Sequence, residues 1–500
     1  MRKVCKKLFI SAGINESSSI FPVIIVALLL FMHFVCCSTN REETQDAGID
    51  ADVDNESDAS ASDDAGGDSD SGSDTDTDAD TDADADADAS SDSGNAGFCG
   101  NAVIEGSEEC DDANDVDMDG CHECSITAIL VDEGDSTRTV YGPDVAFMKN
   151  GAFAVAWLSN NDDENPLDTD LFLKIFDKDG VVAVDDVPVT DSGWDISIAS
   201  GTSGNLVIIW SELGTKTFAA RLYDSSGTPL TDAFDVNTFS DADSADVAMA
   251  ADGSFVAVWT SFDSNEQDLA VFARRFDSAG AALGGEWRIN GTAPSQGATA
   301  PLIEMDDNGN FIVAGSLAMN LSSTNFGMRF EADGTEIQDT TGIGWGSSYP
   351  ALAVAPDGRF AVAYCDVYCD VTSARIYDED AEGMGETFDV GEGNPEFIGI
   401  NDDDEVYVFC QSWDVSSKKP VFTAGRYESD GTLIGSSFDY IDPPPEQGFQ
   451  SAGMDMMPRG HFVTAWDIGT RDADNNPIRG AVYVQRFSDS GRKLGTNPWP

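Results

Sequence analysis

A sevenfold repeat of two short motifs constrains the fold of this chain more than any other feature. The first motif is an apolar run that usually ends in an aromatic residue, such as SFVAVW at 254–259, and the second is a basic residue followed by an aromatic and an Asp turn, such as RRFDSAG at 274–280. The apolar runs recur roughly every 46–56 residues, the length of one four-stranded blade. The repeat therefore predicts an all-β, seven-bladed β-propeller over residues 127–500. The apolar runs are Phe153–Trp157, Leu206–Trp210, Ser254–Trp259, Phe311–Gly315, Phe360–Tyr364, Val406–Cys410 and Phe462–Trp466, and the basic residues are Lys174, Arg221, Arg275, Arg329, Arg375, Arg426 and Arg486.

The two ends of the repeat region indicate how the ring closes. Hairpin signals such as Asp252-Gly253 precede the apolar runs, so each unit offers four strands. The last unit ends early, with only RKLGTNPWP after its turn, whereas a strand-like run at Thr127–Asp132 precedes the first unit. We expect this run to pair with the strand around Tyr483–Phe487 and to complete the seventh blade, because closure removes two exposed sheet edges.

Residues 1–37 have the pattern of an export signal. Basic residues precede an apolar run at Phe21–Val35, which is short for a membrane span. The pair Cys36-Cys37 that follows resembles a bacterial lipoprotein cleavage box, which implies lipidation of Cys37, or of Cys36. A lipid anchor would place the protein at the bacterial cell surface with the membrane as a partner. A cleaved secretory peptide and an uncleaved anchor remain alternatives.

Residues 38–97 are predicted to form a disordered acidic linker. The segment consists almost entirely of Asp, Ala, Ser, Thr and Gly and includes the run DTDTDADTDADADADA. Such a chain cannot bury a core, and its like charges repel one another. We expect an extended stalk that holds the folded part away from a membrane.

A small cysteine-rich module is predicted at residues 98–126. Its four cysteines, in an exported chain, indicate two disulfides of undetermined pairing, with a zinc site as the alternative. The stretches CGN at 99–101, EECDDAN at 108–114 and DGC at 119–121 closely resemble the Myxococcus-type cysteine-rich repeat of secreted bacterial proteins. The cysteines are Cys99, Cys110, Cys121 and Cys124.

Within this module, Asp115, Asp117 and Asp119 alternate ahead of Gly120. Carboxylates at positions one, three and five open a calcium loop, but Ile126 stands where the bidentate Glu at position twelve is expected. Calcium is therefore a possible cofactor, and the alternative is that these Asp residues support tight turns.

The remaining cysteines lie in the repeat region. Cys365 and Cys369 flank a short loop, which predicts a disulfide across that hairpin, and a bridge between Cys365 and Cys410 is the competing hypothesis. Cys410 otherwise occupies the position of the blade aromatic, as a small buried apolar residue. The VW-type strands and RFD-type turns resemble uncharacterised secreted bacterial propeller repeats, and this resemblance implies a fold rather than an activity.

Charge and histidine content limit the possible functions. A net charge of −66 argues against nucleic acid as a partner, and three histidines provide no evident multi-His metal site or Ser–His–Asp triad. We expect a non-catalytic head that binds an extracellular protein or glycan through loops. A hydrolase with a carboxylate pair in the propeller channel and a structural envelope component are the alternatives. The loops are Asn160–Asp168, Phe262–Asp268 and Trp413–Lys419.

The repeated basic residue has two interpretations. One cation in each blade could form an anion-binding ring around the propeller. Because each cation is followed by an Asp turn, we favour a structural pair between strands.

Overall fold

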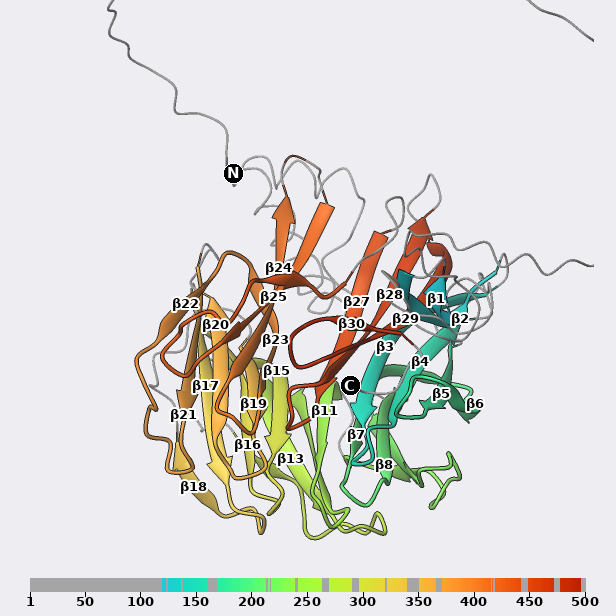
Figure 1. Ribbon diagram of the computed structural model, residues 1–500. Coiled ribbons are helices and arrows are strands. Elements are labelled where there is room, and N and C mark those ends of the chain that lie inside the picture. The colour runs from blue at the N-terminus through green and yellow to red at the C-terminus, as the bar shows by residue number, and fades with distance from the viewer. Residues whose placement is uncertain are drawn as a thin grey trace, which may run out of the picture. The chain divides into compact units, whose positions relative to one another are not determined.

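The computed structural model describes residues 119–495 apart from short gaps, and within these residues the chain folds as a β-propeller made of strands (Figure 1). No helix in the described part has the length and apolar character needed to span a membrane. The gaps are 123–124, 136–137, 161–168, 213–214, 216, 239–241, 263–268, 290–295, 320–321, 340–349, 366–370, 415, 417–418, 442–447 and 472–476.

Six blades are four-stranded antiparallel sheets built from consecutive strands, as the repeat predicts. Blade 1 comprises β3 (Thr139–Phe147), β4 (Phe153–Asn160), β5 (Thr169–Phe176) and β6 (Val182–Thr190). Blade 2 comprises β7 (Gly193–Ser200), β8 (Leu206–Glu212), β9 (Thr217–Tyr223) and β10 (Phe234–Asp235). Blade 3 comprises β11 (Ala242–Met249), β12 (Phe255–Phe262), β13 (Leu269–Phe276) and β14 (Trp287–Arg288). Blade 4 comprises β15 (Gln296–Met305), β16 (Phe311–Met319), β17 (Ser322–Phe330) and β18 (Glu336–Asp339). Blade 5 comprises β19 (Ala351–Val354), β20 (Phe360–Cys365), β21 (Thr372–Tyr377) and β22 (Phe388–Gly391). Blade 6 comprises β23 (Asn394–Ile400), β24 (Val406–Asp414), β25 (Lys419–Tyr427) and β26 (Phe438–Asp439).

The seventh blade joins the two ends of the described chain, as the sequence predicts. Its strands β27 (Gly448–Met456), β28 (Phe462–Arg471) and β29 (Pro477–Phe487) are completed by β2 (Ser125–Glu133), with Ile129 opposite Val484 and Leu130 opposite Tyr483. The closing strand begins at Ser125, two residues before the predicted start. Two further strands lie at the outer side of this sheet: β1 (Asp119–His122) pairs with β2, and β30 (Lys493–Leu494) pairs with β29.

In several blades the first residue of the second strand stacks on the aromatic residue of the basic motif. Phe153 at the start of β4 stacks on Phe176 at the end of β5, with ring centroids 4.8 Å apart. These side chains are fully buried, and so are Trp157, Trp210 and Trp259 near the other end of the second strands. Stacked aromatics bury large apolar areas, so the five blades with this pair each carry their own part of the core. The same pair recurs as Phe255–Phe276, Phe311–Phe330, Phe360–Tyr377 and Phe462–Phe487.

Glycine is required where blade 7 meets blade 1. Gly134 donates its backbone N–H to the carbonyl of Gly480 over 2.7 Å. A Cβ added at Gly480 would collide with the backbone carbonyl of Val140 in β3. The absence of a side chain therefore permits the close approach of β29 and β3 beside the closing strand.

Candidate functional site: carboxylates around the propeller axis

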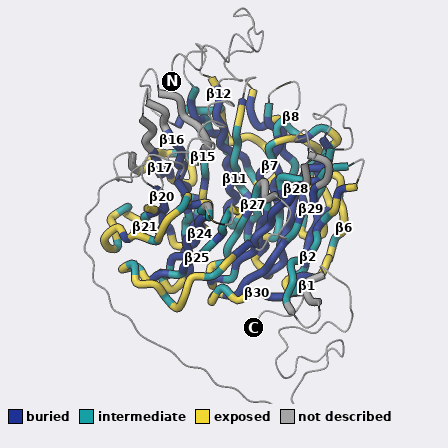
Figure 2. Tube along the Cα trace, turned by 90° about the horizontal axis from the view of Figure 1, so that it is seen from above, coloured by how far each residue is buried: buried dark blue, intermediate teal, exposed yellow. Residues whose placement is uncertain are grey.

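The first strand of each blade is its innermost strand, and these strands surround the propeller axis (Figure 2). Strands β27, β3, β7, β11 and β15 follow one another around this axis in direct contact. Each of these five strands carries at least one acid, and four of the acids belong together electrostatically, namely Asp455 on β27, Asp144 on β3, Asp246 on β11 and Glu304 on β15. Burial among protein atoms raises the pKa of both Asp144 and Glu304, and the charges of Asp246 and Asp455 raise it further. Blades 7, 1, 3 and 4 converge at the axis, so the four acids form one electrostatic cluster there.

Asp144 links blade 1 to blade 2. Its Oδ1 accepts the N–H of Val145 over 2.9 Å, and its Oδ2 accepts the N–H of Ile198 in β7 over 3.0 Å. Enclosure by protein raises the pKa of Asp144 to about 7, against the opposing effect of the two N–H donors. Since both carboxyl oxygens are engaged, the main role of this side chain is to join two inner strands.

Asp246 and Asp455 repeat this arrangement. In each case one oxygen accepts the N–H of the next residue and the other accepts an N–H of the following blade. Asp246 thus joins blades 3 and 4, and Asp455 joins blades 7 and 1. Burial is the first cause of a raised pKa at both residues, to about 6 for Asp455. The donors are Val247 and Ile303 for Asp246, with Ser197 Oγ in addition, and Met456 and Phe147 for Asp455.

A β-bulge interrupts six of the seven described inner strands at the same height. The extra residue of a bulge redirects the neighbouring side chains. In blade 2 this residue is Asp195, with a φ of 48°, whose pKa is raised to about 6 by burial and by the charge of Asp243. Beside the bulge of blade 7, fully buried Asp467 accepts the N–H and Oγ–H of Ser451 over 2.8 and 2.6 Å. The bulges lie at Tyr141–Asp144, Trp194–Ile196, Asp243–Ala245, Thr299–Leu302, Pro395–Phe397 and Phe449–Ser451.

Glu304 and Glu396 differ from these joining residues. Both residues are exposed, and neither side chain makes a hydrogen bond or ion pair within the described residues. Although they are exposed, the protein atoms gathered around them at the axis reduce the hydration of their carboxyl groups. This raises the pKa of Glu396 to about 7 and that of Glu304 well above its usual value. A carboxyl group that is free and has a raised pKa can donate a proton near neutral pH.

Two exposed aromatic side chains lie on one face of the ring. We define the upper face as the end where the inner strands begin, which also carries the loops β4–β5, β8–β9 and β12–β13. Trp194, at the start of β7, is 49% exposed, and Phe262, at the end of β12 in the next blade, is 46% exposed. Trp194 directly precedes Asp195 of the bulge. The sequence signal was DSGWD at 191–195, which lies outside both repeated motifs and was missed.

The repeated cations are structural, but their main partners differ from those expected. Five of the seven donate to a backbone carbonyl of an adjacent blade, and Arg486 donates to the carbonyl of Gly495 in its own blade. Lys174 and Arg426 also form ion pairs, with Asp185 and Asp186 at 3.1 Å each and with Glu405 at 2.6 Å. The carbonyl bonds run from Lys174 to Val131, Arg221 to Val189, Arg275 to Asp333, Arg329 to Glu379 and Arg426 to Asp489.

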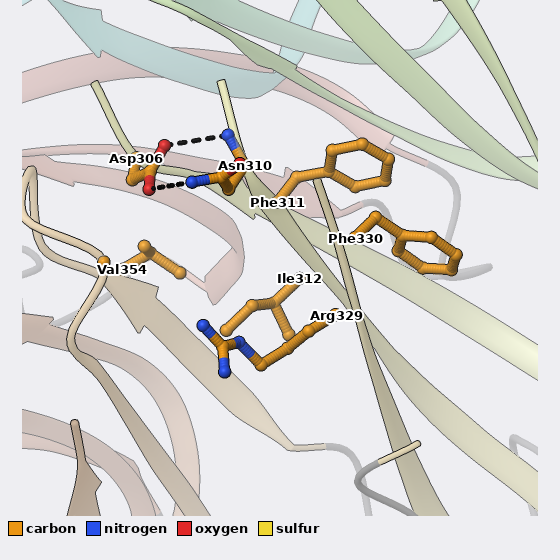
Figure 3. Close-up of a pocket in the computed structure, with 8 residues that line it drawn as sticks. Asp306, Asn310, Phe311, Ile312, Arg329, Phe330 and Val354 are labelled. Carbon is orange, nitrogen blue, oxygen red and sulfur yellow. Dashed lines mark hydrogen bonds between the residues drawn. The ribbon is translucent and has the colours of Figure 1, made fainter. Parts of the chain in front are cut away.

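A small cavity near Arg329 offers little space for a ligand. It lies between blades 4 and 5, and its volume of about 10 Å³ corresponds to roughly one water molecule. Asp306 on its wall accepts both the backbone N–H and the side-chain amide of Asn310, over 2.8 and 2.9 Å (Figure 3). The cavity is therefore a packing gap between blades.

The cysteines of the repeat region have different states. Cys365 is disulfide-bonded, and Cys369, its expected partner, lies outside the described residues. Cys410 is a buried free thiol, so the competing bridge between Cys365 and Cys410 is not formed. Burial raises the pKa of the Cys410 thiol to about 12.

Several predicted site residues lie outside the described part of the chain. Of the candidate calcium and disulfide residues in the cysteine-rich module, Asp119 and Cys121 have a described backbone, in β1. Of the three predicted binding loops, two are described only at their first residue, Asn160 or Phe262, and the third lacks residues 415, 417 and 418. Among the described residues, no group of three or more His, Cys, Asp or Glu side chains is arranged to hold a metal ion. The residues outside the description are Cys36, Cys37, Cys99, Cys110, Asp115, Asp117, Cys124 and Cys369.

Comparison with protein families identifies one short segment. Residues 96–125 match the model of a domain of unknown function, DUF4215. This range contains all four cysteines of the cysteine-rich module. Among curated proteins, none matches this chain.

Several solved structures resemble the chain at low identity. The β-propeller domain of the Trilobed protease from Pyrococcus furiosus, which has an open velcro topology, is 10% identical, with 72% of this chain and 96% of that chain covered and a TM-score of 0.42. The polysaccharide lyase Uly1 is 10% identical, with 72% and 91% covered and a TM-score of 0.43. An alpha-L-arabinanase of Penicillium chrysogenum complexed with arabinobiose is 12% identical, with 72% and 98% covered and a TM-score of 0.40. At this level the likeness concerns fold and not activity.

Proposed function

We propose that the propeller is the glycan-binding head of a lipid-anchored protein of the bacterial cell surface. This proposal rests on the exposed indole ring of Trp194. A flat aromatic face suits the apolar C–H face of a sugar ring, and Trp combines that face with a hydrogen-bond donor. Asp195 and exposed Asp243 of the adjacent blade provide carboxylate acceptors for sugar hydroxyls.

The hydrogen bonds of the axial carboxylates support a binding function rather than a catalytic one. Asp144, Asp246 and Asp455 accept N–H donors with both oxygens, so their carboxyls are used to join blades. The proposed anchor is Cys37, and residues 38–97 would serve as the stalk between the membrane and the head. An extracellular protein ligand at the same face is the alternative occupant.

A glycan array on residues 98–500 tests this proposal. For glycans that bind, Trp194→Ala should weaken binding at least about tenfold, as for an aromatic hot spot. Leu230→Ala is the matched control, because Leu230 is equally exposed at 49% but lies in the connection between β9 and β10 of the same blade. Unchanged affinity of the Trp194→Ala protein, or binding to proteins alone in a parallel pull-down, would overturn the assignment.

Glu304 favours a second candidate function, hydrolysis of glycans. It is the member of the axial cluster whose carboxyl group is free, and its pKa is raised. Incubating the protein with a panel of polysaccharides, followed by a reducing-end assay, tests this candidate. Activity that is lost in Glu304→Gln and kept in Glu336→Gln, a control on the outer strand β18, would support hydrolysis. Absence of activity across the panel would reject it.

A further inference from the structure

The exposed side chain of Trp194 lies on the side of blade 2 that faces blade 3. Trp194 pairs with Ser211 in β8, one residue after Trp210. Trp210 is buried in the core between blades 1 and 2, whereas Val207 and Ile209 are buried in the core between blades 2 and 3. Because successive side chains alternate along a strand, Ser211 and its partner Trp194 also face blade 3. The indole therefore lies at the upper end of the junction between these two blades.

Two carboxylates from adjacent blades lie at the same junction. Asp195 is the bulge residue that follows Trp194, and Asp243 lies near the upper end of β11 in blade 3. The two inner strands are in direct contact. Burial and the charge of Asp243 raise the pKa of Asp195 to about 6, against the opposing effect of the backbone N–H of Ala245 in β11. The carboxylates of Asp195 and Asp243 therefore repel each other across the junction.

The strands that form this junction contain acids and no bases. Strands β7, β8, β11 and β12 carry no Lys or Arg, and their acids are Asp195, Glu212, Asp243 and Asp246. Within the described residues, the carboxylate of Asp243 makes no hydrogen bond or ion pair. Arg221 in β9 donates to the carbonyl of Val189 in blade 1, away from blade 3. A group bound beside Trp194 therefore meets a negative potential, which favours a cation and disfavours an anion.

We propose that this junction recognises amino sugars, in which a protonated amine lies between Asp195 and Asp243 while the C–H face of the ring packs on Trp194. The inference rests on the proposed glycan-binding function and names the class of glycan. An ammonium group donates three hydrogen bonds, and its charge offsets the repulsion between the two carboxylates. The indole favours a sugar over an inorganic cation, because an inorganic ion has no apolar face to place against it. A uronic acid at this position is repelled.

Calorimetric titration of the full chain with two matched oligosaccharides tests this inference. A β-linked hexamer of glucosamine and the same hexamer of N-acetylglucosamine present similar ring faces, but near neutral pH only the first carries ammonium groups. At low ionic strength the glucosamine hexamer should bind at least about tenfold more tightly, the gain expected from one charge-assisted hydrogen bond. This preference should shrink as salt is added. Equal affinity for the two hexamers would overturn the inference.

Charge-matched variants locate the amine. Asp243→Asn should remove most of the preference for the glucosamine hexamer. Asp235→Asn is the matched control, because Asp235 is also exposed but lies on the outer strand β10 of blade 2, and it should keep the preference. If Asp243→Asn does not fold, Asp195→Asn replaces it, since Asn tolerates the φ of 48° at that position. A similar loss in the junction variant and in Asp235→Asn would contradict recognition at the junction.

The outcomes separate this inference from the proposed function. Binding of neutral glycans that depends on Trp194, without any advantage for the glucosamine hexamer, would leave glycan binding intact and overturn amine recognition. If no glycan of the array and neither hexamer binds, both fail. A hexamer of lysine measures attraction by charge alone. Binding of this peptide as tightly as the glucosamine hexamer, with no effect of Trp194→Ala on either ligand, would also overturn the inference.

Discussion

The carboxylate of Asp144 in the first blade accepts a 3.0 Å hydrogen bond from the backbone N–H of Ile198 in the second blade. Similar bonds join blade 3 to blade 4 through Asp246 and blade 7 to blade 1 through Asp455. Four carboxyl groups therefore take part in one cluster at the axis while three of them hold inner strands together. The stability of the ring should respond to the protonation of this cluster.

We expect the protein to lose stability as the pH rises from 5 to 8. The folded-state pKa values of about 7 for Asp144 and about 6 for Asp455 exceed the ordinary Asp value of 3.8. The folded state therefore binds these protons more tightly, and the resulting stability, complete below about pH 4, is lost through pH 6–7. The melting temperature across this range measures the effect.

A charge-matched pair of variants separates this effect from general repulsion. Asp455→Asn should flatten the profile between pH 5 and 8. Asp333→Asn removes the same charge from a residue whose pKa is lowered by its bonds to Thr335, so its slope in this window should match the wild type. A melting temperature that is constant or rises from pH 5 to 8 would contradict the prediction.

Loss of a buried side chain from the closing strand β2 should destabilise the whole ring. Ile129→Ala should lower the free energy of unfolding by about 2–5 kcal/mol, because Ile129 is only 6% exposed and lies between two blades. Ile337→Ala removes the same atoms from a site that is 45% exposed and should change it by less than about 0.5 kcal/mol. Urea denaturation measures both. Similar losses in the two variants would indicate that packing of β2 does not contribute specifically to the free energy of unfolding.

Deletion variants test closure at a coarser scale. Removal of residues 98–133 should expose an edge of β29 and lower the melting temperature, whereas removal of residues 40–97 should leave it almost unchanged. If both deletions melt alike, the closing strand does not contribute as proposed.

Cys410 should be inert in the folded protein. Its thiol is buried, and its pKa is raised to about 12, so almost no reactive thiolate exists at pH 8. Mass spectrometry after iodoacetamide treatment should find Cys410 unmodified in native protein and alkylated after denaturation. Rapid alkylation of the native protein would show that blade 6 opens.

The proposed membrane anchor depends on Cys37. Replacement Cys37→Ser should release the protein from the membrane fraction, and Cys36→Ser should do so less, because acylation requires the cysteine at the cleavage point. Immunoblots of membrane and soluble fractions give the result. Equal retention of both variants in the membrane fraction would exclude lipidation at this pair.

Local sequence signals were sufficient to predict the architecture. The aromatic partners Phe153 and Phe176 lie in the two repeated motifs of one blade, so a pattern within about 25 residues specifies their contact. The closing strand could also be predicted, because an incomplete last unit and an unmatched Thr127–Asp132 together supply one four-stranded sheet. Turn residues such as Gly253, with a φ of 86°, marked the hairpins.

The axial carboxylates were missed, although a signal was present. Asp144 and Asp246 occur in the matching stretches PDVAFM and ADVAMA, at the same position of their inner strands. An Asp in a half-buried strand ordinarily faces solvent, so this match alone indicates no special environment. The binding loops, by contrast, were predicted from a general rule, which is that binding residues usually lie in the segments that connect strands.

The sequence alone determined the number of blades, their hairpins and the pairing of the two chain ends, because these depend on periodic apolar residues and turn chemistry that act within or at the ends of each unit. Only the tertiary structure decided the environment of the acids. Ile198, the partner of Asp144, lies 54 residues further along the chain, and Asp455, which influences its pKa, lies 311 residues away in blade 7. Closure of the ring brings these groups together, and the protein packed around the axis then removes the water that would otherwise stabilise their charges.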